Sequence, residues 1–314
     1  MLFNPVKVGV VGVGALGEHH ARIYAGLEET ELVALVDIQA ERAHTLASRY
    51  GSAAYTDYEQ IFDLVEAVSL AVPTNEHARI GRHFLERGIH VLVEKPIAHD
   101  LEGADELIAA QQAGGVLHVG HSERFNPAFQ AVRPHVKTPQ FFEAHRLGIF
   151  VPRSLDVDVV LDLMIHDLDL ILLMVKSRIC EVRAVGIPVL TPRIDIANAR
   201  IEFEDGCVAN LTASRVSREK IRKLRFFQPH DYLSIDFHQQ EVEMFSLAED
   251  GHERRIMQRE LEIRHDEPLR QEILSFIGAI RGQDIGQDLP AGCSGDEGKR
   301  ALELALRILG EMSR

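Results

Sequence analysis

The chain has 314 residues, enough for two domains of ordinary size, and its 46% hydrophobic and 26% charged residues are normal for a globular protein. The net charge is −14, from 34 Lys and Arg against 48 Asp and Glu, so the field of the protein repels nucleic acid and anionic membrane surfaces. No stretch approaches the roughly 20 uncharged apolar residues of a membrane span, and three widely spaced cysteines indicate neither a disulfide framework nor a zinc site. We therefore expect a cytoplasmic protein that binds no nucleic acid, membrane or metal.

The first part of the chain alternates short apolar, β-rich runs with segments of helix-like apolar spacing. This alternation is typical of a parallel sheet with helices on both faces, and near-continuous apolar runs fit strands that are covered on both sides. The predicted strands are Lys7–Val11, Leu32–Val36, Val68–Val72, His90–Val93 and Leu117–Val119, and the predicted helices are Leu16–Glu28, Ala40–Tyr50, Glu76–Arg87 and Leu101–Ala113.

The pattern changes near residue 121. One long apolar-rich helix is predicted over Leu155–Val175, and segments with a period of two follow it. Residues 197–203 and 207–214 alternate apolar and polar side chains on either side of Asp205-Gly206, a tight-turn signal, which predicts a β-hairpin. Further strands are predicted over Lys223–Phe227, Tyr232–Phe237 and Glu241–Leu247, and helices over Glu267–Arg281 and Ser294–Met312.

These elements predict an α/β protein of two domains. Residues 1–121 are expected to form an N-terminal Rossmann domain with a doubly wound parallel sheet. Residues 122–314 are expected to form an α+β domain with a large open antiparallel sheet. If the open face of that sheet is apolar, as Ala197, Ile201 and Phe203 indicate, it needs a partner surface, so we expect a homodimer or homotetramer.

A glycine-rich turn, Gly12-Val13-Gly14-Ala15-Leu16-Gly17, follows the first predicted strand and opens the first predicted helix. Gly12 allows a tight turn, Gly14 lets the backbone approach a pyrophosphate, and Gly17 permits close packing of helix on strand. The helix N-terminus then offers N–H groups and partial positive charge to the phosphates. Asp37, at the end of the second strand, would accept hydrogen bonds from the adenine ribose and repel a 2′-phosphate, which favours NAD over NADP.

Two other segments carry groups suited to acid–base chemistry. Glu94-Lys95-Pro96 follows a predicted strand, at the edge of the sheet where open α/β folds bind ligands, and Pro96 favours an extended Lys95. Asp162 and His166 are four residues apart and share one face of a predicted helix. From the residues alone, the favoured interpretations are a surface lysine for Lys95 and a satisfied pair inside the core for Asp162 and His166.

The chain resembles the Gfo/Idh/MocA family in segments that follow the family's order: Val10–Gly17 with Asp37, residues 73–77, Glu94-Lys95-Pro96 and Asp162–His166. The resemblance covers nearly the whole chain. It implies a nucleotide-binding domain, a C-terminal domain whose open sheet mediates oligomerisation, and a substrate pocket lined by Lys95, Asp162 and His166 beside the nicotinamide. The predicted cofactor-binding residues are Gly12, Gly14, Ala15, Leu16, Gly17, Asp37, Pro73, Thr74, Asn75, His77, Glu94 and Lys95.

The resemblance and the chemistry of these groups predict an enzyme that oxidises a secondary alcohol on a sugar. Such an oxidation moves a hydride to NAD and leaves a proton for the protein to take. His166, as a neutral imidazole, is the predicted general base, and Lys95 would stabilise the developing alkoxide. Asp162 would orient the substrate or tune its charged neighbours. The roles of Lys95 and His166 are interchangeable at this stage.

Residues 215–225 reverse the acidic balance of the chain, with six basic side chains against Glu219. They are interpreted as a site for the diphosphate of a nucleotide sugar, or else as a solvated strand edge. The segments 121–127 and 164–169 are most similar to the UDP-N-acetylglucosamine 3-dehydrogenases of the family. This implies oxidation at C3 of a UDP-N-acetylhexosamine to a 3-keto nucleotide sugar, which a partner aminotransferase would then use. The predicted substrate-binding residues are Lys95, Arg124, Asn126, Arg153, Asp162, His166, Arg215 and Lys220.

Three other functions stay open. A member of the same family could act on a free polyol or monosaccharide, with the basic segment as surface decoration. Asp162, His166 and Asp169, at i, i+4 and i+7 of one helix, could hold a metal in a hydrolase, although an ammonium from Lys95 in the same pocket would oppose a cation. A protein of this fold could also sense a nucleotide without turnover, an interpretation that the presence of both Lys95 and His166 opposes.

Overall fold

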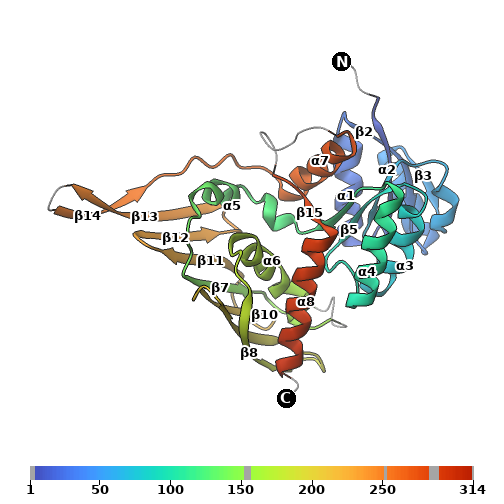
Figure 1. Ribbon diagram of the computed structural model, residues 1–314. Coiled ribbons are helices and arrows are strands. Elements are labelled where there is room, and N and C mark those ends of the chain that lie inside the picture. The colour runs from blue at the N-terminus through green and yellow to red at the C-terminus, as the bar shows by residue number, and fades with distance from the viewer. Residues whose placement is uncertain (1–3, 152–156, 251–252, 283–289, 313–314) are drawn as a thin grey trace. The chain divides into compact units, whose positions relative to one another are not determined.

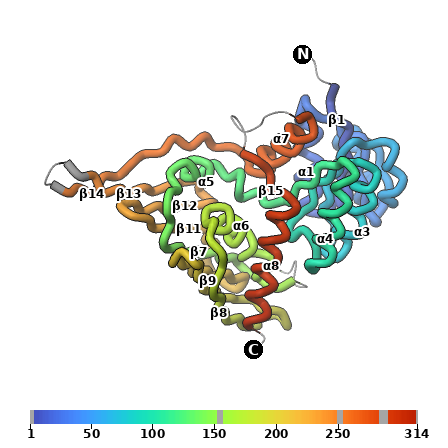
Figure 2. The backbone as a smooth tube through the Cα atoms, in the orientation of Figure 1, coloured from blue at the N-terminus to red at the C-terminus, as the bar shows by residue number. Residues whose placement is uncertain are grey.

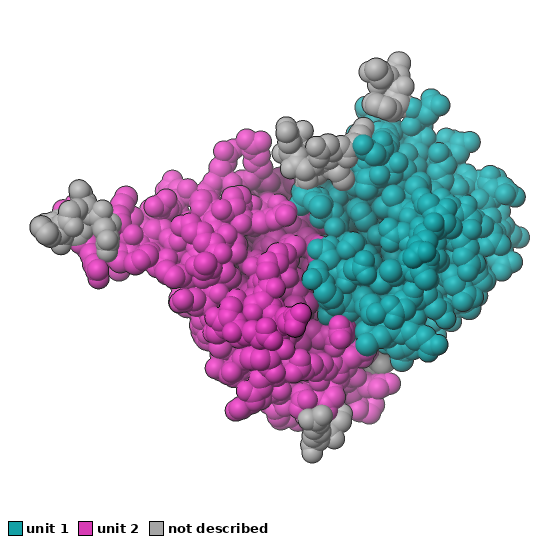
Figure 3. All heavy atoms as spheres, in the orientation of Figure 1, with its two compact units in different colours: residues 1–122, 267–302 teal, residues 123–266, 303–314 magenta. Residues whose placement is uncertain are grey.

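The structure is a computed structural model, and it describes residues 4–151, 157–250, 253–282 and 290–312. The chain divides into two compact units (Figure 3): unit 1 takes residues 1–122 and 267–302, and unit 2 takes residues 123–266 and 303–314. Within the described ranges, no helix combines the length and the apolar character that crossing a membrane requires. The predicted domain boundary near residue 121 stays a prediction. The structure also groups residues 267–302 with unit 1.

Unit 1 contains a seven-stranded sheet, sheet A, in the order β15-β6-β5-β4-β1-β2-β3. All neighbours in it are parallel except β15, which runs antiparallel to β6. This is the strand order of a doubly wound nucleotide-binding fold. The strands are β1 (Val6–Val11), β2 (Thr30–Val36), β3 (Ala53–Tyr55), β4 (Ala67–Leu70), β5 (His90–Glu94), β6 (Leu117–Gly120) and β15 (Cys293–Ser294).

The helices of unit 1 pack on sheet A because its strands are apolar on both faces. All four residues of β4 are buried, as expected for a doubly covered strand. α1 packs beside α7, and the buried Ile273, Phe276 and Ile277 of α7 join the core around β1 and β2. That packing explains why this late segment belongs to unit 1. The helices are α1 (Ala15–Gly26), α2 (Ala40–Tyr50), η1 (Tyr58–Ile61), α3 (Thr74–Leu85), α4 (Leu101–Ala110), η2 (Gln111–Ala113) and α7 (Pro268–Ile280).

Unit 2 contains an eight-stranded sheet, sheet B, in the order β14-β13-β12-β11-β7-β10-β9-β8. Its strands are antiparallel except for the central pair β7 and β10, which are parallel. The predicted hairpin of β9 and β10 is confirmed, with Gly206 in the left-handed region at φ 85°. The trace in Figure 2 follows β13 and β14 as a long hairpin at one edge. The strands are β7 (Phe141–Leu147), β8 (Ile179–Ile187), β9 (Ile196–Phe203), β10 (Val208–Ser214), β11 (Ile221–Gln228), β12 (Asp231–Asp236), β13 (Glu241–Asp250) and β14 (Glu253–Arg259).

One face of sheet B, here called the inner face, is covered by the helices of unit 2. α5 packs on β12, and the π-helical turn η5, which leads into α6, packs on β10 (Figure 1). α8 begins in unit 1 and ends in unit 2. The helices are η3 (Ser122–Phe125), α5 (Pro127–Val132), η4 (Arg133–His135), η5 (Val160–Met164), α6 (Ile165–Met174) and α8 (Gly295–Met312).

The sequence assigned Ala197, Ile201 and Phe203 to an open face, and this is wrong. Each is at most 2% exposed within the single chain, so these side chains lie on the inner face. Their neighbours Asn198 and Arg200 point to the outer face instead. The alternation of polar and apolar residues identified the strand correctly, but a period of two does not say which face the helices cover.

The long helix predicted over Leu155–Val175 begins later than expected. Leu155 lies outside the described residues, and helical structure begins at Val159, directly before η5. The carbonyl oxygen of Asp158 accepts hydrogen bonds from the N–H groups of Leu161 and Asp162 just ahead of the helix. The side chain of Asp158 does not cap the helix, because its Oδ1 accepts a hydrogen bond from the backbone N–H of Ile194 (2.8 Å).

Candidate functional site

The turn after β1 has the geometry that a dinucleotide requires. Gly12 has a φ of 84°, and a Cβ atom there would lie 2.6 Å from the carbonyl oxygen of Ala71. A Cβ atom on Gly17 would lie 1.8 Å from the carbonyl oxygen of Gly12, so only glycine lets α1 pack this closely. Around Gly14 a Cβ atom would meet nothing within 4 Å. The backbone at Gly14 therefore faces open space, into which a pyrophosphate fits.

The N-terminus of α1 points its first N–H groups toward this turn. Its cap residue is Gly14, and no side chain in the described part of the chain caps the helix there. Ala15 and Leu16 form the first turn, and Leu16 is 52% exposed. An uncapped helix start beside a glycine turn is a preformed anion site. These residues thus fit the phosphates of a dinucleotide cofactor.

Asp37, predicted to bind the adenine ribose, ties β2 to the glycine turn. Its Oδ2 accepts hydrogen bonds from the backbone N–H of Val13 (3.1 Å) and from the guanidinium of Arg42 (3.3 Å). Its Oδ1 accepts from the backbone N–H of Gln39 (2.9 Å). A cavity of about 470 Å³ adjoins these groups and is lined by the turn, by Gln39 and by Arg42. The sequence did not single out Arg42, which α2 carries five residues after Asp37.

The loops that follow β4 and β5 are joined by His77. Its Nδ1 lies 2.9 Å from the carbonyl oxygen of Pro96, and its Nε2 lies 3.0 Å from the carbonyl oxygen of Val72. The ring is buried in α3, and burial lowers its pKa although both carbonyls favour the charged form. His77 therefore braces the backbone beside Lys95, across a Lys95-Pro96 peptide that is cis. Pro73 precedes α3, and Thr74 opens it.

A chain of hydrogen bonds from α1 and β4 holds the side chain of Glu94. His20 Nε2 donates to Glu94 Oε1 (3.0 Å), and His20 Nδ1 lies 3.0 Å from the Ser69 hydroxyl, which also lies 2.9 Å from the Tyr24 hydroxyl. Burial raises the pKa of Glu94, but the His20 hydrogen bond and the charges of His20 and Lys95 outweigh it, so the net pKa is lowered. The backbone N–H of Lys95 donates to Glu94 Oε2 (3.3 Å).

His20 was not among the site residues predicted from the sequence, although a signal was available. Gly17, His20, Ala21 and Tyr24 recur at helical spacing, so they share the face of α1 that is turned toward sheet A. A histidine on such a face is buried and needs a partner, and Glu94 supplies it.

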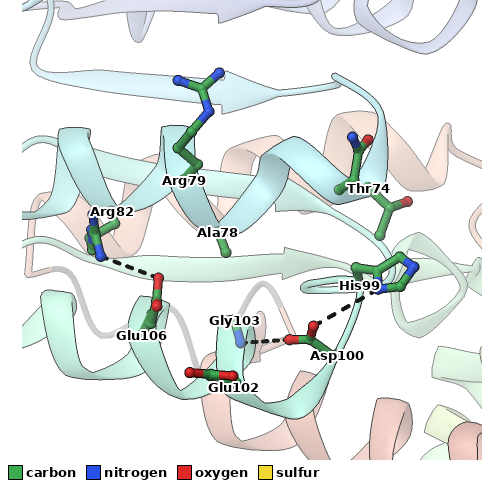
Figure 4. A pocket seen from close by; sticks show the side chains of 10 residues that line it. Thr74, Ala78, Arg79, Arg82, His99, Asp100, Glu102, Gly103 and Glu106 are labelled. Carbon is green, nitrogen blue, oxygen red and sulfur yellow. Dashed lines mark hydrogen bonds and ion pairs between the residues drawn. The ribbon is translucent and has the colours of Figure 1, made fainter.

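A second groove, of about 360 Å³, lies between α3 and α4 and starts at Thr74 and Asn75 (Figure 4). Three of its charged side chains, Arg79, Arg82 and Glu106, have ion-pair partners. Arg82 pairs with Glu106 (3.3 Å), and Asp100 caps α4 (Figure 4). We therefore interpret the groove as a solvated gap between the surfaces of two helices, and we assign it no role.

In unit 2, η5 carries Asp162 and α6 carries His166, and both side chains are partly exposed. The neighbouring Asp167 is held by two parallel hydrogen bonds from Arg146, at 2.9 and 2.8 Å. Arg146 also donates to Glu123 (2.8 Å). Burial lowers the pKa of Arg146, but the carboxylates of Asp167 and Glu123 outweigh it and raise it well above its usual range. This clamp fixes how α6 is rotated on sheet B.

A second arginine holds the other acidic side chain of α6. Arg124 donates two hydrogen bonds to Asp169, at 2.7 and 2.6 Å, and both side chains are buried. Both oxygens of Asp169 thus face a guanidinium. This pairing opposes the metal site considered for Asp162, His166 and Asp169, because a ligand carboxylate already neutralised by arginine is a poor partner for a cation.

The remaining predicted substrate residues differ in their surroundings. Asn126 caps α5 and donates to the carbonyl oxygen of Phe237 (3.0 Å), so its side chain has a structural task. Arg215 is buried, donates to the carbonyl oxygen of Val157 and lies 3.6 Å from Asp195. Lys220 is exposed between β10 and β11. Arg153 lies outside the described residues. A role for these four in substrate binding stays a prediction.

Comparison with known proteins decides the family. A model described as an oxidoreductase family with an NAD-binding Rossmann fold matches residues 6–121, and a model of the GFO/IDH/MocA C-terminal domain matches residues 104–228. The UDP-N-acetylglucosamine 3-dehydrogenase of Acidithiobacillus ferrooxidans is 37% identical over 311 residues, 96% of each chain. The chain belongs to the Gfo/Idh/MocA family. The predicted family, the predicted fold class and the assignment to the oxidoreductases are confirmed.

Solved structures and a second relative agree with this placement. A crystal form of the Acidithiobacillus ferrooxidans enzyme matches with a TM-score of 0.88 and 38% identity, over 98% of both chains. The inositol 2-dehydrogenase of Rhizobium meliloti is 27% identical over 322 residues, 96% of this chain and 94% of the relative. A levoglucosan dehydrogenase in complex with NADH matches with a TM-score of 0.85 at 17% identity, which shows the shared fold.

Proposed function

We propose that the protein is an NAD-dependent sugar dehydrogenase that oxidises C3 of a UDP-N-acetylhexosamine to a 3-keto nucleotide sugar. The observation that carries the proposal is the glycine turn of unit 1, where Gly14 faces open space and Asp37 binds the turn from the next strand. Lys95 follows β5 at the same edge of sheet A. The 37% identity to a UDP-N-acetylglucosamine 3-dehydrogenase supports the substrate class.

The cofactor would lie along the carboxyl edge of sheet A. The backbone of the glycine turn and the start of α1 would hold its pyrophosphate, and Asp37 would hold the adenine ribose. The Asp37 carboxylate favours NAD, because it would repel the 2′-phosphate of NADP. When bound, the nicotinamide supplies the acceptor for the hydride.

The protein's own task is the proton of the sugar hydroxyl. We assign His166 as the general base, because imidazole accepts a proton near neutral pH without a large penalty. Lys95 would hydrogen-bond the same hydroxyl and stabilise the negative charge that develops on oxygen. Asp162 would orient the sugar. The partly buried Glu94 and the brace from His77 would hold the backbone of Lys95 in place.

The test is turnover with purified protein, followed by the absorbance of NADH. We expect NADH to form with UDP-N-acetylglucosamine and not with myo-inositol, free glucose or free N-acetylglucosamine. Oxidation of myo-inositol or glucose in place of the nucleotide sugar would overturn the substrate and favour a polyol dehydrogenase. Tight NADH binding without turnover of any sugar would overturn the enzymatic role and favour a nucleotide sensor.

We further propose that the protein works in the cytoplasm as a homo-oligomer, and that an aminotransferase consumes its 3-keto product. The outer face of sheet B supports assembly, since Val185 and Ile187 of the edge strand β8 are 57% and 54% exposed. Light scattering on the purified protein checks the assembly, and a monomer at micromolar concentration would contradict it. A ketone at C3 is a substrate for transamination, which a coupled assay with an added aminotransferase checks.

A further inference from the structure

Arg222 of β11 lies on the inner face of sheet B. Along this strand Arg222, Leu224 and Phe226 alternate with residues of the outer face, and Leu224 and Phe226 are fully buried beneath the helices. Arg225 belongs to the outer face. The guanidinium of Arg222 is therefore directed to the side of the sheet on which η5 and α6 pack, although it stays 40% exposed.

The register of the sheet sets Arg222 directly opposite Arg146 of β7. Two like charges opposite each other on neighbouring strands repel, so counter-charges must hold them. Arg146 has its own, because Asp167 and Glu123 accept three hydrogen bonds from it. The Oε1 atom of Glu123 lies 2.8 Å from Arg146 but 3.8 Å from Arg222, so its contact with Arg222 is the weaker of the two.

Arg222 is thus the less satisfied of the two cations. In the described ranges of the chain, its guanidinium forms no hydrogen bond, and its one ion pair is the long contact with Glu123. Burial and the charge of Arg146 lower the pKa of Arg222, whereas nearby carboxylates, Asp162 among them, act to raise it. A partly exposed guanidinium with unused N–H donors is well suited to bind an anionic group from solution.

We propose that Arg222 binds the diphosphate of the nucleotide-sugar substrate, an assignment that rests on the proposed function. In such a substrate, C3 is separated from the nearest phosphorus only by C2, C1 and the glycosidic oxygen. A group that holds the phosphate must therefore lie within a side chain's reach of the residues that act at C3, and Arg222 lies on the face of sheet B on which η5, the turn that carries Asp162, packs. The sequence pointed to Arg215 and Lys220 within the same basic segment, but Arg215 is committed to Asp195 and to backbone carbonyls.

The test compares Arg222→Gln with Arg225→Gln on the same strand. Arg225 is a matched control, because it is 43% exposed and lies 3.7 Å from Glu143, yet it belongs to the outer face. For Arg222→Gln we expect KM for UDP-N-acetylglucosamine and the inhibition constant of UDP to rise at least about tenfold, as for loss of a charge-assisted hydrogen bond. The Kd of NADH, measured by nicotinamide fluorescence, should stay at the wild-type value, and Arg225→Gln should match wild type throughout.

Arg222→Lys keeps the charge and should recover part of the affinity for UDP, which also separates anion binding from a folding defect. Inorganic phosphate and glucuronate serve as further inhibitors. An Arg222 effect on glucuronate but not on UDP would overturn the diphosphate assignment in favour of a sugar carboxylate. Values for Arg222→Gln within about twofold of Arg225→Gln would overturn the role of Arg222. A wild-type protein that neither oxidises UDP-N-acetylglucosamine nor binds UDP would overturn the proposed function together with this inference.

Discussion

In unit 1 the proposed phosphate site is made of main chain, whereas in unit 2 the proposed site is held by charged side chains. The glycine turn presents backbone N–H groups, its shape depends on the missing side chains of Gly12 and Gly17, and the missing side chain of Gly14 leaves open space beside it. In unit 2, two buried arginines instead fix the rotation of α6, the helix that carries His166. Arg146 pairs with Asp167, and Arg124 pairs with Asp169.

The two designs fail in different ways. A backbone site tolerates change in most side chains but is blocked by one methyl group in the wrong place. A site held by buried ion pairs is sensitive to the loss of either partner, because the remaining charge is left without compensation. Unit 1 should therefore lose binding before it loses stability, and unit 2 should lose stability together with activity.

Removal of Arg146 should have the largest effect. Arg146→Met leaves Asp167 and Glu123 buried without their cation, and we expect the free energy of unfolding to fall by about 3–5 kcal/mol. Urea denaturation measures the change. Arg225→Met, on the outer face of the same sheet, should change stability by no more than about 0.5 kcal/mol. Equal effects of the two substitutions would show that the buried ion pairs of Arg146 do not stabilise unit 2.

The acid–base residues should affect catalysis strongly in both units. We expect His166→Ala and Lys95→Ala each to lower kcat for UDP-N-acetylglucosamine at least about 100-fold. A pH–rate profile of each variant then shows which group acts as the base, because the corresponding limb of the profile disappears. Lys137→Ala, which removes an exposed lysine paired with Asp231, is the control and should keep wild-type turnover. Our assignment is wrong if neither substitution reaches that loss.

Asp195 offers a pH-dependent test of the charge network in unit 2. Burial opposes its ionisation, but the hydroxyl of Thr191 and the N–H groups of residues 189–191 outweigh this and lower its pKa to about 2. A lowered pKa stabilises the fold above the ordinary pKa of an aspartate, and this contribution disappears as the pH falls through the native value.

Asp195→Asn should therefore cost about 1–3 kcal/mol near neutral pH, as for hydrogen bonds to a charged group, and progressively less toward pH 2. Urea midpoints of both proteins across that range measure the difference. A cost that stays constant with pH would show that the carboxylate charge is not what holds the loop and Arg215.

Gly14→Ala should separate binding from stability in unit 1. Its φ of −67° suits alanine, and the added methyl group meets no protein atom within 4 Å, so stability should be unchanged. The methyl group would nevertheless lie where the pyrophosphate approaches, and we expect the Kd of NADH to rise about tenfold. Gly26→Ala, at the other end of α1 and equally unobstructed, should bind NADH normally. Normal NADH binding by the Gly14 variant would place the cofactor elsewhere.

Asp37 should give the smallest effect, a change in cofactor preference. Asp37→Ser removes the charge that repels a 2′-phosphate and leaves Arg42 beside the position of the ribose. We expect NADPH to gain affinity relative to NADH by roughly fivefold, and the added change Arg42→Ala to cancel that gain. Fluorescence titrations with both cofactors measure it. An unchanged preference would mean that Asp37 does not face the ribose.

Local sequence determined unit 1 to a large extent. The order of strands and helices, the glycine turn, Asp37 and Glu94-Lys95-Pro96 all lie within short segments, because backbone turns and helix starts depend on neighbours in the chain. The family resemblance extended this to the fold and the oxidoreductase class. The short strand β3 and the addition of residues 267–302 to this unit were not predicted, since they depend on contacts between distant segments.

The sequence alone determined which residue types are available in unit 2, and only the tertiary structure decided their tasks. Arg215, Arg222 and Arg225 look alike in one basic segment, yet one is buried against Asp195, one meets Glu123 on the inner face and one meets Glu143 on the outer face. The physical reason is that an arginine's role depends on which carboxylate the fold brings to it and on how much water remains. Neither quantity is encoded in spacing along the chain.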